Sequence, residues 1–118
     1  VSGGFHETVD RLAEQLGVDY VKANRLEIKQ GLLTGQVLGE IVTKDTKLAM
    51  LKAWAAENNL ELNQTIAMGD GANDLSMIQA AGMGIAFMAK PIVREQAPYQ
   101  IQERNLYRVI DLLDNRKE

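Results

Sequence analysis

The chain has 118 residues and a mass of 13.1 kDa, with 13 basic and 16 acidic side chains and a formal net charge of −3. That length suits one small domain, and 46% hydrophobic with 25% charged residues is typical of globular proteins and argues against disorder. A pI near 5.2 gives no support for a nucleic-acid binder, and the absence of cysteine excludes disulfide scaffolds, thiolate zinc sites and cysteine nucleophiles.

The first half of the chain predicts a helix, a hairpin and a second helix. Apolar residues with the spacing of one helix face precede a stop at Gly17; they are Phe5, Val9, Leu12 and Leu16. Residues 20–28 are predicted to be extended, and Gln30-Gly31 predicts a hairpin turn into the segment 32–37. A second helix, capped by Thr43 or Asp45 and ending near Asn58, turns one set of side chains inward: Leu48, Leu51, Trp54 and Ala55.

The second half predicts strands that alternate with helices. The strands are the apolar runs 65–68 and 84–87 and the shorter run 99–101. One helix runs from about Asn73 to a stop at Gly82, one begins at Pro91, and a last one is capped by Asn105. The side chains expected to face inward are Leu75, Ile78 and Ala81, then Leu106, Val109, Ile110 and Leu113. This alternation predicts a single α/β domain with a largely parallel sheet covered on both faces.

The sequence also suggests a compartment and an origin. No apolar run approaches the roughly 18–20 residues that cross a bilayer, and no signal peptide is visible, so we expect a cytoplasmic protein. The chain opens with Val1-Ser2 and carries no initiator methionine. We therefore expect it to be a piece of a longer protein.

The densest chemical signal is the loop from Gly69 to Asp74, at the carboxyl end of a predicted strand, where open α/β sheets place ligands. Asp70 and Asp74 lie four residues apart across this turn, so their carboxylates can converge on one point. Hard oxygen ligands of this kind suit Mg²⁺, and the Asn73 amide can hydrogen-bond a phosphate. The alternative is a plain turn in which Asp74 or Asn73 only caps the following helix.

Two weaker signals could bind phosphate. The Ser2 hydroxyl and the Gly3 amide lie just before a predicted helix, where unpaired N–H groups and the helix dipole favour an anion. The alternative for Ser2 is simple helix capping. Lys47 lies in the first turn of a helix, where the dipole does not favour a cation, and it could neutralise phosphate oxygens. The alternative is a solvated surface lysine beside Lys44 and Lys52.

Taken in order, these motifs resemble the haloacid dehalogenase superfamily. The resemblance rests on Ser2–Phe5, the interior Lys47, the loop 69–74 and the segment Ala86–Pro91, and within the superfamily it is greatest to the C-terminal half of the phosphoserine phosphatases. It spans essentially the whole chain. It implies that residues 1–118 are the C-terminal part of a Rossmann-like, three-layer α/β core with a mostly parallel sheet. The first strand and the cap would be absent.

The resemblance also implies a chemistry and a role for each residue. A nucleophilic aspartate would take the phosphoryl group of O-phosphoserine, and water would hydrolyse the aspartyl-phosphate. Asp70 would ligate Mg²⁺, and Asp74 would support the metal directly or through water. Lys47 would balance charge. The phosphate would be held by Ser2, Gly3, Lys47 and Asn73. Lys47 and Asp74 would be the catalytic residues of this chain.

One departure limits these expectations. The superfamily's Asp-x-Asp-x-Thr/Ser nucleophile motif appears nowhere in the sequence, so we expect the chain alone to be inactive. Without the first strand, sheet edges would be exposed, so we expect association with the N-terminal half or with a second copy. Two alternatives stay open: another small-molecule phosphatase of the superfamily, or a non-catalytic α/β interaction module.

Overall fold

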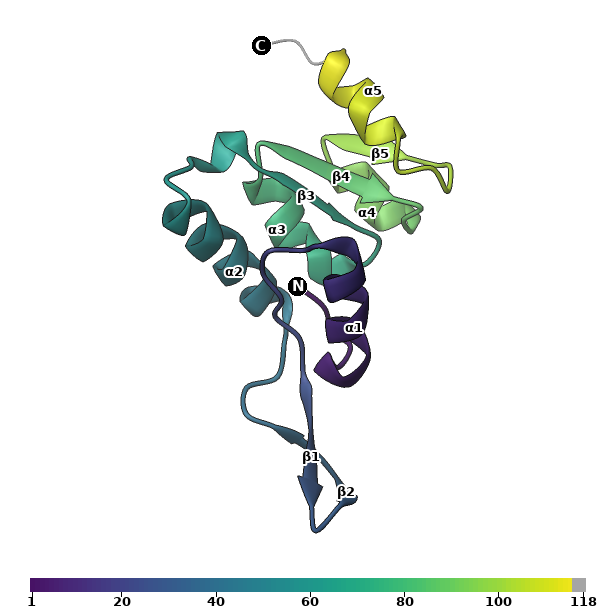
Figure 1. Ribbon diagram of the computed structural model, residues 1–118. Helices are drawn as coiled ribbons and strands as arrows, with labels where there is room; N and C mark the ends of the chain where they lie inside the picture. The colour runs from purple at the N-terminus through teal and green to yellow at the C-terminus, as the bar shows by residue number, and fades with distance from the viewer. Residues whose placement is uncertain (116–118) are drawn as a thin grey trace. The chain divides into compact units, whose positions relative to one another are not determined.

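The computed structural model describes residues 1–115. These residues fall into two compact units, which divide between Met50 and Leu51. The boundary between the units lies inside the helix α2 (Lys44–Glu57). Within the described part of the chain, no helix combines the length and the apolar character that a membrane span requires. Each unit has its own secondary structure (Figure 1).

The first unit contains the predicted helix and hairpin. Helix α1 (His6–Leu16) ends at Gly17, whose left-handed φ of 71° lets the chain turn back on the last carbonyls of the helix. Strands β1 (Arg25–Lys29) and β2 (Leu32–Leu38) pair antiparallel. The turn between them has positive φ at both Gln30 and Gly31, which is the turn geometry that two-residue hairpins favour.

The inward side chains of α2 largely follow the prediction. Ala55 is buried, and Leu48, Leu51 and Trp54 are half-buried. At the start of the helix the Thr43 amide donates to the Thr46 hydroxyl at 3.1 Å, and the Lys47 amide donates to the Thr43 carbonyl. Thr43 thus takes the position that the sequence analysis assigned to the cap.

The second unit is built on a parallel sheet in the order β3–β4–β5. Its strands are Ile66–Gly69, Met83–Phe87 and Tyr99–Ile101. A short 3-10 helix η1 (Leu62–Gln64) precedes β3, and η2 (Ala72–Asp74) leads into α3 (Leu75–Ala80). Helices α4 (Pro91–Gln96) and α5 (Arg108–Asp114) complete the unit. Pro91 takes the first turn of α4, as predicted.

Strand β4 divides the core of the second unit into two layers. Its side chains alternate, so Ala86 packs with Ile78 and Val93 on the face covered by α3 and α4. Met83 and Ile85 pack on the other face with Ile101 and with residues of α5. The helices accordingly lie on opposite sides of the sheet (Figure 1). The predicted parallel sheet with helices on both faces is confirmed.

The last helix differs from the prediction. The helix begins at Arg108, and Val109 and Leu112 are the residues of α5 that pack on the sheet. Leu106, Ile110 and Leu113 are exposed, so the prediction that they face inward is wrong. Val109 and Leu112 are half-buried and three residues apart, a spacing that places them on one face of the helix, while Leu106 lies before the helix begins. The Asn105 side chain caps the turn before the helix, accepting from the Tyr107 amide at 3.0 Å.

Close packing at Gly84 gives a test of this core. A Cβ at Gly84 would overlap the backbone of Ile78 in α3, which cannot move without shifting the helix. Gly84→Ala should lower the free energy of unfolding by about 1–3 kcal/mol, the usual cost of overpacking. Urea denaturation measures this loss. Gly3→Ala is the control because nothing lies within 4 Å of its Cβ position; equal stability of the two variants would contradict the packing.

Candidate functional site

A buried carboxylate organises the loop between β3 and α3. Asp74 is 5% exposed, and its Oδ2 accepts the backbone amides of Asp70 at 3.1 Å and Gly71 at 3.2 Å. Hydrogen bonds to an ionised acceptor are among the stronger ones in proteins. The carboxylate therefore closes the loop on itself from its C-terminal end.

The side chain of Asp74 engages the turn before it and not helix α3. Asp74 stands at the position before α3, but its side chain makes no cap hydrogen bond to that helix. Asn73 is exposed and lies inside η2. Asp74 instead caps the start of η2 by accepting from the Gly71 amide, and its role at a metal site stays a prediction.

Asp70, in contrast to Asp74, is exposed. Its backbone is fixed on both sides: the amide donates to Asp74, and the carbonyl accepts from the Lys90 amide at 3.5 Å. Within residues 1–115, no hydrogen bond or ion pair engages the side chain of Asp70. A hard, ionised oxygen donor is thus held at the carboxyl end of β3.

The donor chemistry of this loop fits a divalent cation in part. An exposed carboxylate at a fixed backbone position is the kind of ligand that Mg²⁺ takes. Among the residues that the structure describes, no group of three or more histidine, cysteine, aspartate or glutamate side chains is arranged to hold a metal. The loop would therefore supply only part of a coordination shell.

Asp70 also lines a cavity of about 430 Å³ at the carboxyl end of the sheet. The cavity wall comes from the ends of two neighbouring strands and from the loop after β5: Met68, Gly69, Asp70, Phe87, Met88 and Arg104. Open α/β sheets bind ligands at this edge. Arg104 was not recognised from the sequence as a candidate. Its one available signal was a basic side chain in the loop after the last strand of the sheet.

In the first unit, Ser2 and Gly3 lie in a turn that a buried asparagine anchors. The Ser2 hydroxyl accepts from the Gly4 amide at 2.9 Å, two residues along, and α1 begins only at His6. Ser2 therefore does not cap the helix, and that alternative is wrong. Asn24, 6% exposed, donates from Nδ2 to the Gly3 carbonyl at 3.0 Å and accepts from the Val42 amide at 2.7 Å. Asn24 was not recognised from the sequence as a residue that positions this turn.

Lys47 is buried, with 8% of its surface exposed. The neighbouring lysines Lys44 and Lys52 are exposed. The alternative of a solvated surface lysine is therefore wrong for Lys47. Burial removes water from the ammonium group, which costs free energy unless surrounding groups interact with the charge. The burial of Lys47 in the first turn of α2 therefore requires such contacts.

The predicted site residues thus fall into two groups. Asp70, Asn73 and Asp74 are brought together in one loop of the second unit. Ser2 and Gly3 share a turn in the first unit, and Lys47 lies on the part of α2 that belongs to the same unit. The convergence of the two groups on one phosphate stays a prediction.

The two loop glycines give a matched pair for testing the loop. A Cβ at Gly69 would overlap the Asp74 side chain, including its Cβ, which cannot swing away. At Gly71 the Cβ would meet only the tip of the exposed Asn73 side chain, at 2.8 Å. Gly69→Ala should therefore destabilise the protein by about 1–3 kcal/mol, and Gly71→Ala should have a much smaller effect. Urea denaturation compares them; a larger loss for Gly71→Ala would contradict the geometry.

Comparison with known proteins assigns the chain to a family. Residues 1–79 match the haloacid dehalogenase-like hydrolase family. The chain is 74% identical over 114 residues to the phosphoserine phosphatase of Streptococcus thermophilus and 54% identical to that of Lactococcus lactis, covering 97% of this chain each time. It spans about half, 53%, of the length of these two relatives.

A solved structure agrees with these relatives. The probable phosphoserine phosphatase from Vibrio cholerae superposes with a TM-score of 0.90 at 47% identity, covering 96% of this chain and 35% of that one. The predicted α/β fold class is thereby confirmed. The chain belongs to the haloacid dehalogenase-like hydrolase family.

Proposed function

We propose that the chain is the C-terminal half of a Mg²⁺-dependent phosphoserine phosphatase, which hydrolyses O-phospho-L-serine to serine and phosphate in serine biosynthesis. Two findings support the proposal. Relatives that are up to 74% identical to the chain are phosphoserine phosphatases, and the chain matches the hydrolase family. The observation that carries the proposal is the loop after β3, where Asp74 fixes the backbone and Asp70 is left exposed.

Each residue has a proposed task in this reaction. Asp70 would hold the Mg²⁺, and Asp74 would support the metal through the loop that its carboxylate closes. Ser2, Gly3 and Asn73 would hold the phosphoryl oxygens. Lys47 would neutralise their charge, which suits a compact ammonium at a water-poor position. Positioning and charge neutralisation supply most of the catalysis in phosphoryl transfer.

The remaining chemistry is proposed to lie outside the chain. When bound, Mg²⁺ would supply charge stabilisation to the phosphoryl oxygens. The nucleophilic aspartate would be supplied by the part of the protein that carries the Asp-x-Asp-x-Thr/Ser motif, which this sequence lacks. Attack by that carboxylate would form an aspartyl-phosphate, which water then hydrolyses. The assignment to the C-terminal half rests on this missing motif and stays a prediction.

An open sheet edge supports a partner that completes the fold. Strand β3 lies at one edge of the three-stranded sheet and, within residues 1–115, pairs with β4 alone. Its Ile66 is 41% exposed, and in the first unit Leu12 and Leu16 of α1 are more than half exposed. Exposed strand edges and apolar side chains favour pairing with another chain. We propose that the N-terminal half or a second copy covers them, in the cytoplasm.

Metal binding tests the role of Asp70. Mn²⁺ should broaden the amide NMR signals of residues 69–74, and Asp70→Asn should remove that broadening because the chain loses its exposed metal ligand. The stability of this variant should stay within about 0.5 kcal/mol of the wild type, since the side chain is exposed. Asp114→Asn, at an exposed position of α5, is the control. Broadening that persists in Asp70→Asn would contradict the assignment.

Activity tests the proposed division of the active site. The purified 118-residue chain should release no phosphate from O-phosphoserine in the presence of Mg²⁺, because it holds no nucleophile motif. A colorimetric phosphate assay at high protein concentration provides the measurement. Robust hydrolysis by this chain, lost on Asp70→Asn, would show that the chain carries its own nucleophile and would overturn the proposal.

A further inference from the structure

We infer that the cavity beside Asp70 is an oxyanion subsite whose binding group is Arg104. The ligand would be a small molecule that presents a phosphate or carboxylate group to the guanidinium. The assignment deepens the proposed function, on which its biological meaning rests, by adding a binding residue to the same edge of the sheet. The inference rests on the cavity, on the fixed backbone around Arg104, on the charges of Arg104 and Asp70, which are unpaired among the described residues, and on the strained residue Met88 in the cavity wall.

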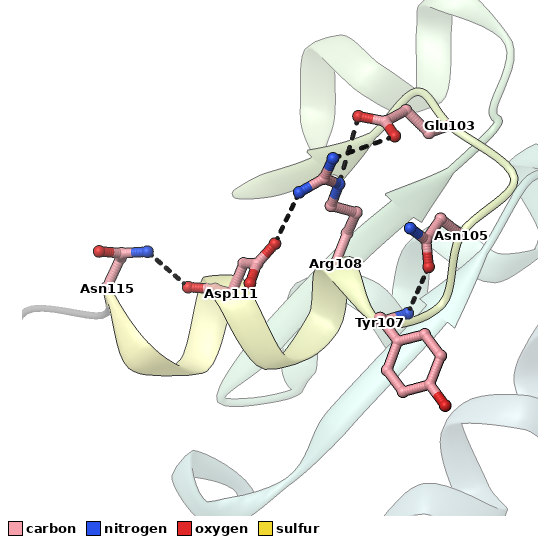
Figure 2. A network of polar contacts seen from close by, with 6 residues as sticks. All are labelled: Glu103, Asn105, Tyr107, Arg108, Asp111 and Asn115. Atoms are coloured by element: carbon pink, nitrogen blue, oxygen red, sulfur yellow. Dashed lines mark hydrogen bonds and ion pairs between the residues drawn. The ribbon is translucent and has the colours of Figure 1, made fainter.

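The position of Arg104 is fixed by contacts on both sides of it. The Asn105 amide donates to the Glu103 carbonyl at 2.8 Å, so Arg104 lies at the centre of a tight turn. The Asn105 side chain holds the next part of the loop by accepting from the Tyr107 amide. The loop that carries Arg104 is thereby tied to the start of α5 (Figure 2).

Glu103, the acid next to Arg104 in the sequence, pairs with another arginine. Glu103 pairs with Arg108 through Nε at 3.3 Å and through Nη2 at 3.4 Å, and Arg108 also donates to Asp111 at 2.9 Å (Figure 2). The hydrogen bond to Asp111 and the attraction of Glu103 raise the pKa of Arg108. The nearest acid along the chain is thus already paired and does not neutralise Arg104.

Arg104 and Asp70 line the same cavity without pairing. Within residues 1–115, neither side chain forms an ion pair, so their charged atoms stand more than the 4.0 Å of a salt bridge apart. Opposite charges that face one space at this separation leave room for a ligand between them. An anion would bind at Arg104, and a cation would bind at Asp70. Arginine suits this task because its planar fork of N–H donors matches phosphate and carboxylate oxygens.

The wall between the two charges contains a strained residue. Met88 follows β4 with a φ of 46°, in the left-handed region that non-glycine residues rarely adopt. Its amide donates to the Ile101 carbonyl at 2.8 Å, which holds it there. Met88 is 42% exposed, and with Met68 and Phe87 it gives the cavity an apolar wall. Strain of this kind is found at binding sites, where the surroundings maintain it.

The subsite also has a defined place relative to the proposed reaction. The transferred phosphoryl group would be bound with the metal at Asp70. The anion at Arg104 would be a second group, either another anionic part of the same ligand or released phosphate. Arg104 is therefore proposed as a binding and specificity residue. It takes no part in bond making or breaking.

Anion binding in the absence of metal tests the subsite separately from the phosphatase proposal. With EDTA present, titration of the chain with inorganic phosphate, and in parallel with acetate, should shift the amide NMR signals of Asp70, Met88 and Arg104. Arg104→Gln should weaken the tighter of the two anions about tenfold, as expected for loss of a charged hydrogen-bonding partner. Arg11→Gln, at an exposed position of α1, is the matched control and should bind as the wild type.

The outcomes separate the two proposals. Loss of binding in Arg104→Gln with retention in Arg11→Gln supports the subsite, and the tighter anion identifies the group. Equal binding in both variants, shifts confined to other residues, or no binding of either anion overturns it. Because EDTA removes the metal, a failure of the Mg²⁺ assignment at Asp70 leaves the expected result unchanged.

Discussion

The carboxylate of Asp74 is the constraint on which the candidate site depends. It accepts two backbone amides of its own loop, and each such bond to a charged acceptor stabilises a structure by about 1.5–3 kcal/mol. The loop can approach this carboxylate because Gly69 has no Cβ to collide with it. The two acids of the loop therefore differ in their surroundings. Asp74 is buried and fixes the backbone, and Asp70 is exposed to a ligand.

The parallel sheet brings the rest of the site to the same edge. Gly69 at the end of β3 is in register with Ala86 on β4, so the loops after both strands begin at one level. The strand ends are further joined where Lys90 donates to the Asp70 carbonyl and Met88 donates to Ile101. The exposed carboxylate of Asp70, the apolar wall with Met88 and the loop residue Arg104 thus lie around one cavity. This arrangement uses the edge at which α/β sheets generally bind ligands.

Much of the fold could be predicted because local patterns determine it. Gly17, Gln30-Gly31 and Pro91 specify their turns and helix ends through backbone geometry alone. The apolar runs of β3 and β4 predicted buried parallel strands with helices on both sides. The contact face of α5 was predicted only in part, because helical spacing allows either Leu112 or Leu113 to share a face with Val109, and only packing against the sheet selects Leu112.

The site was predicted in residue type and only partly in role. The spacing of Asp70 and Asp74 suggested that both carboxylates converge on one cation, and this stays a prediction. The spacing did not reveal that Oδ2 of Asp74 accepts two backbone amides of the loop. The burial of Lys47 and the anchoring role of Asn24 arise from contacts between segments distant in the sequence. Arg104 likewise joins the cavity through the topology of the sheet, since the loop after β5 returns to the ends of β3 and β4.

A crystal structure of the chain soaked with Mn²⁺, with the metal located by anomalous scattering, tests the division between the two acids most directly. The account predicts a metal peak within coordination distance of the Asp70 carboxylate, with Oδ2 of Asp74 still bonded to the amides of Asp70 and Gly71. A peak on Oδ2 of Asp74, with the amides of Asp70 and Gly71 no longer bonded to that oxygen, would contradict it.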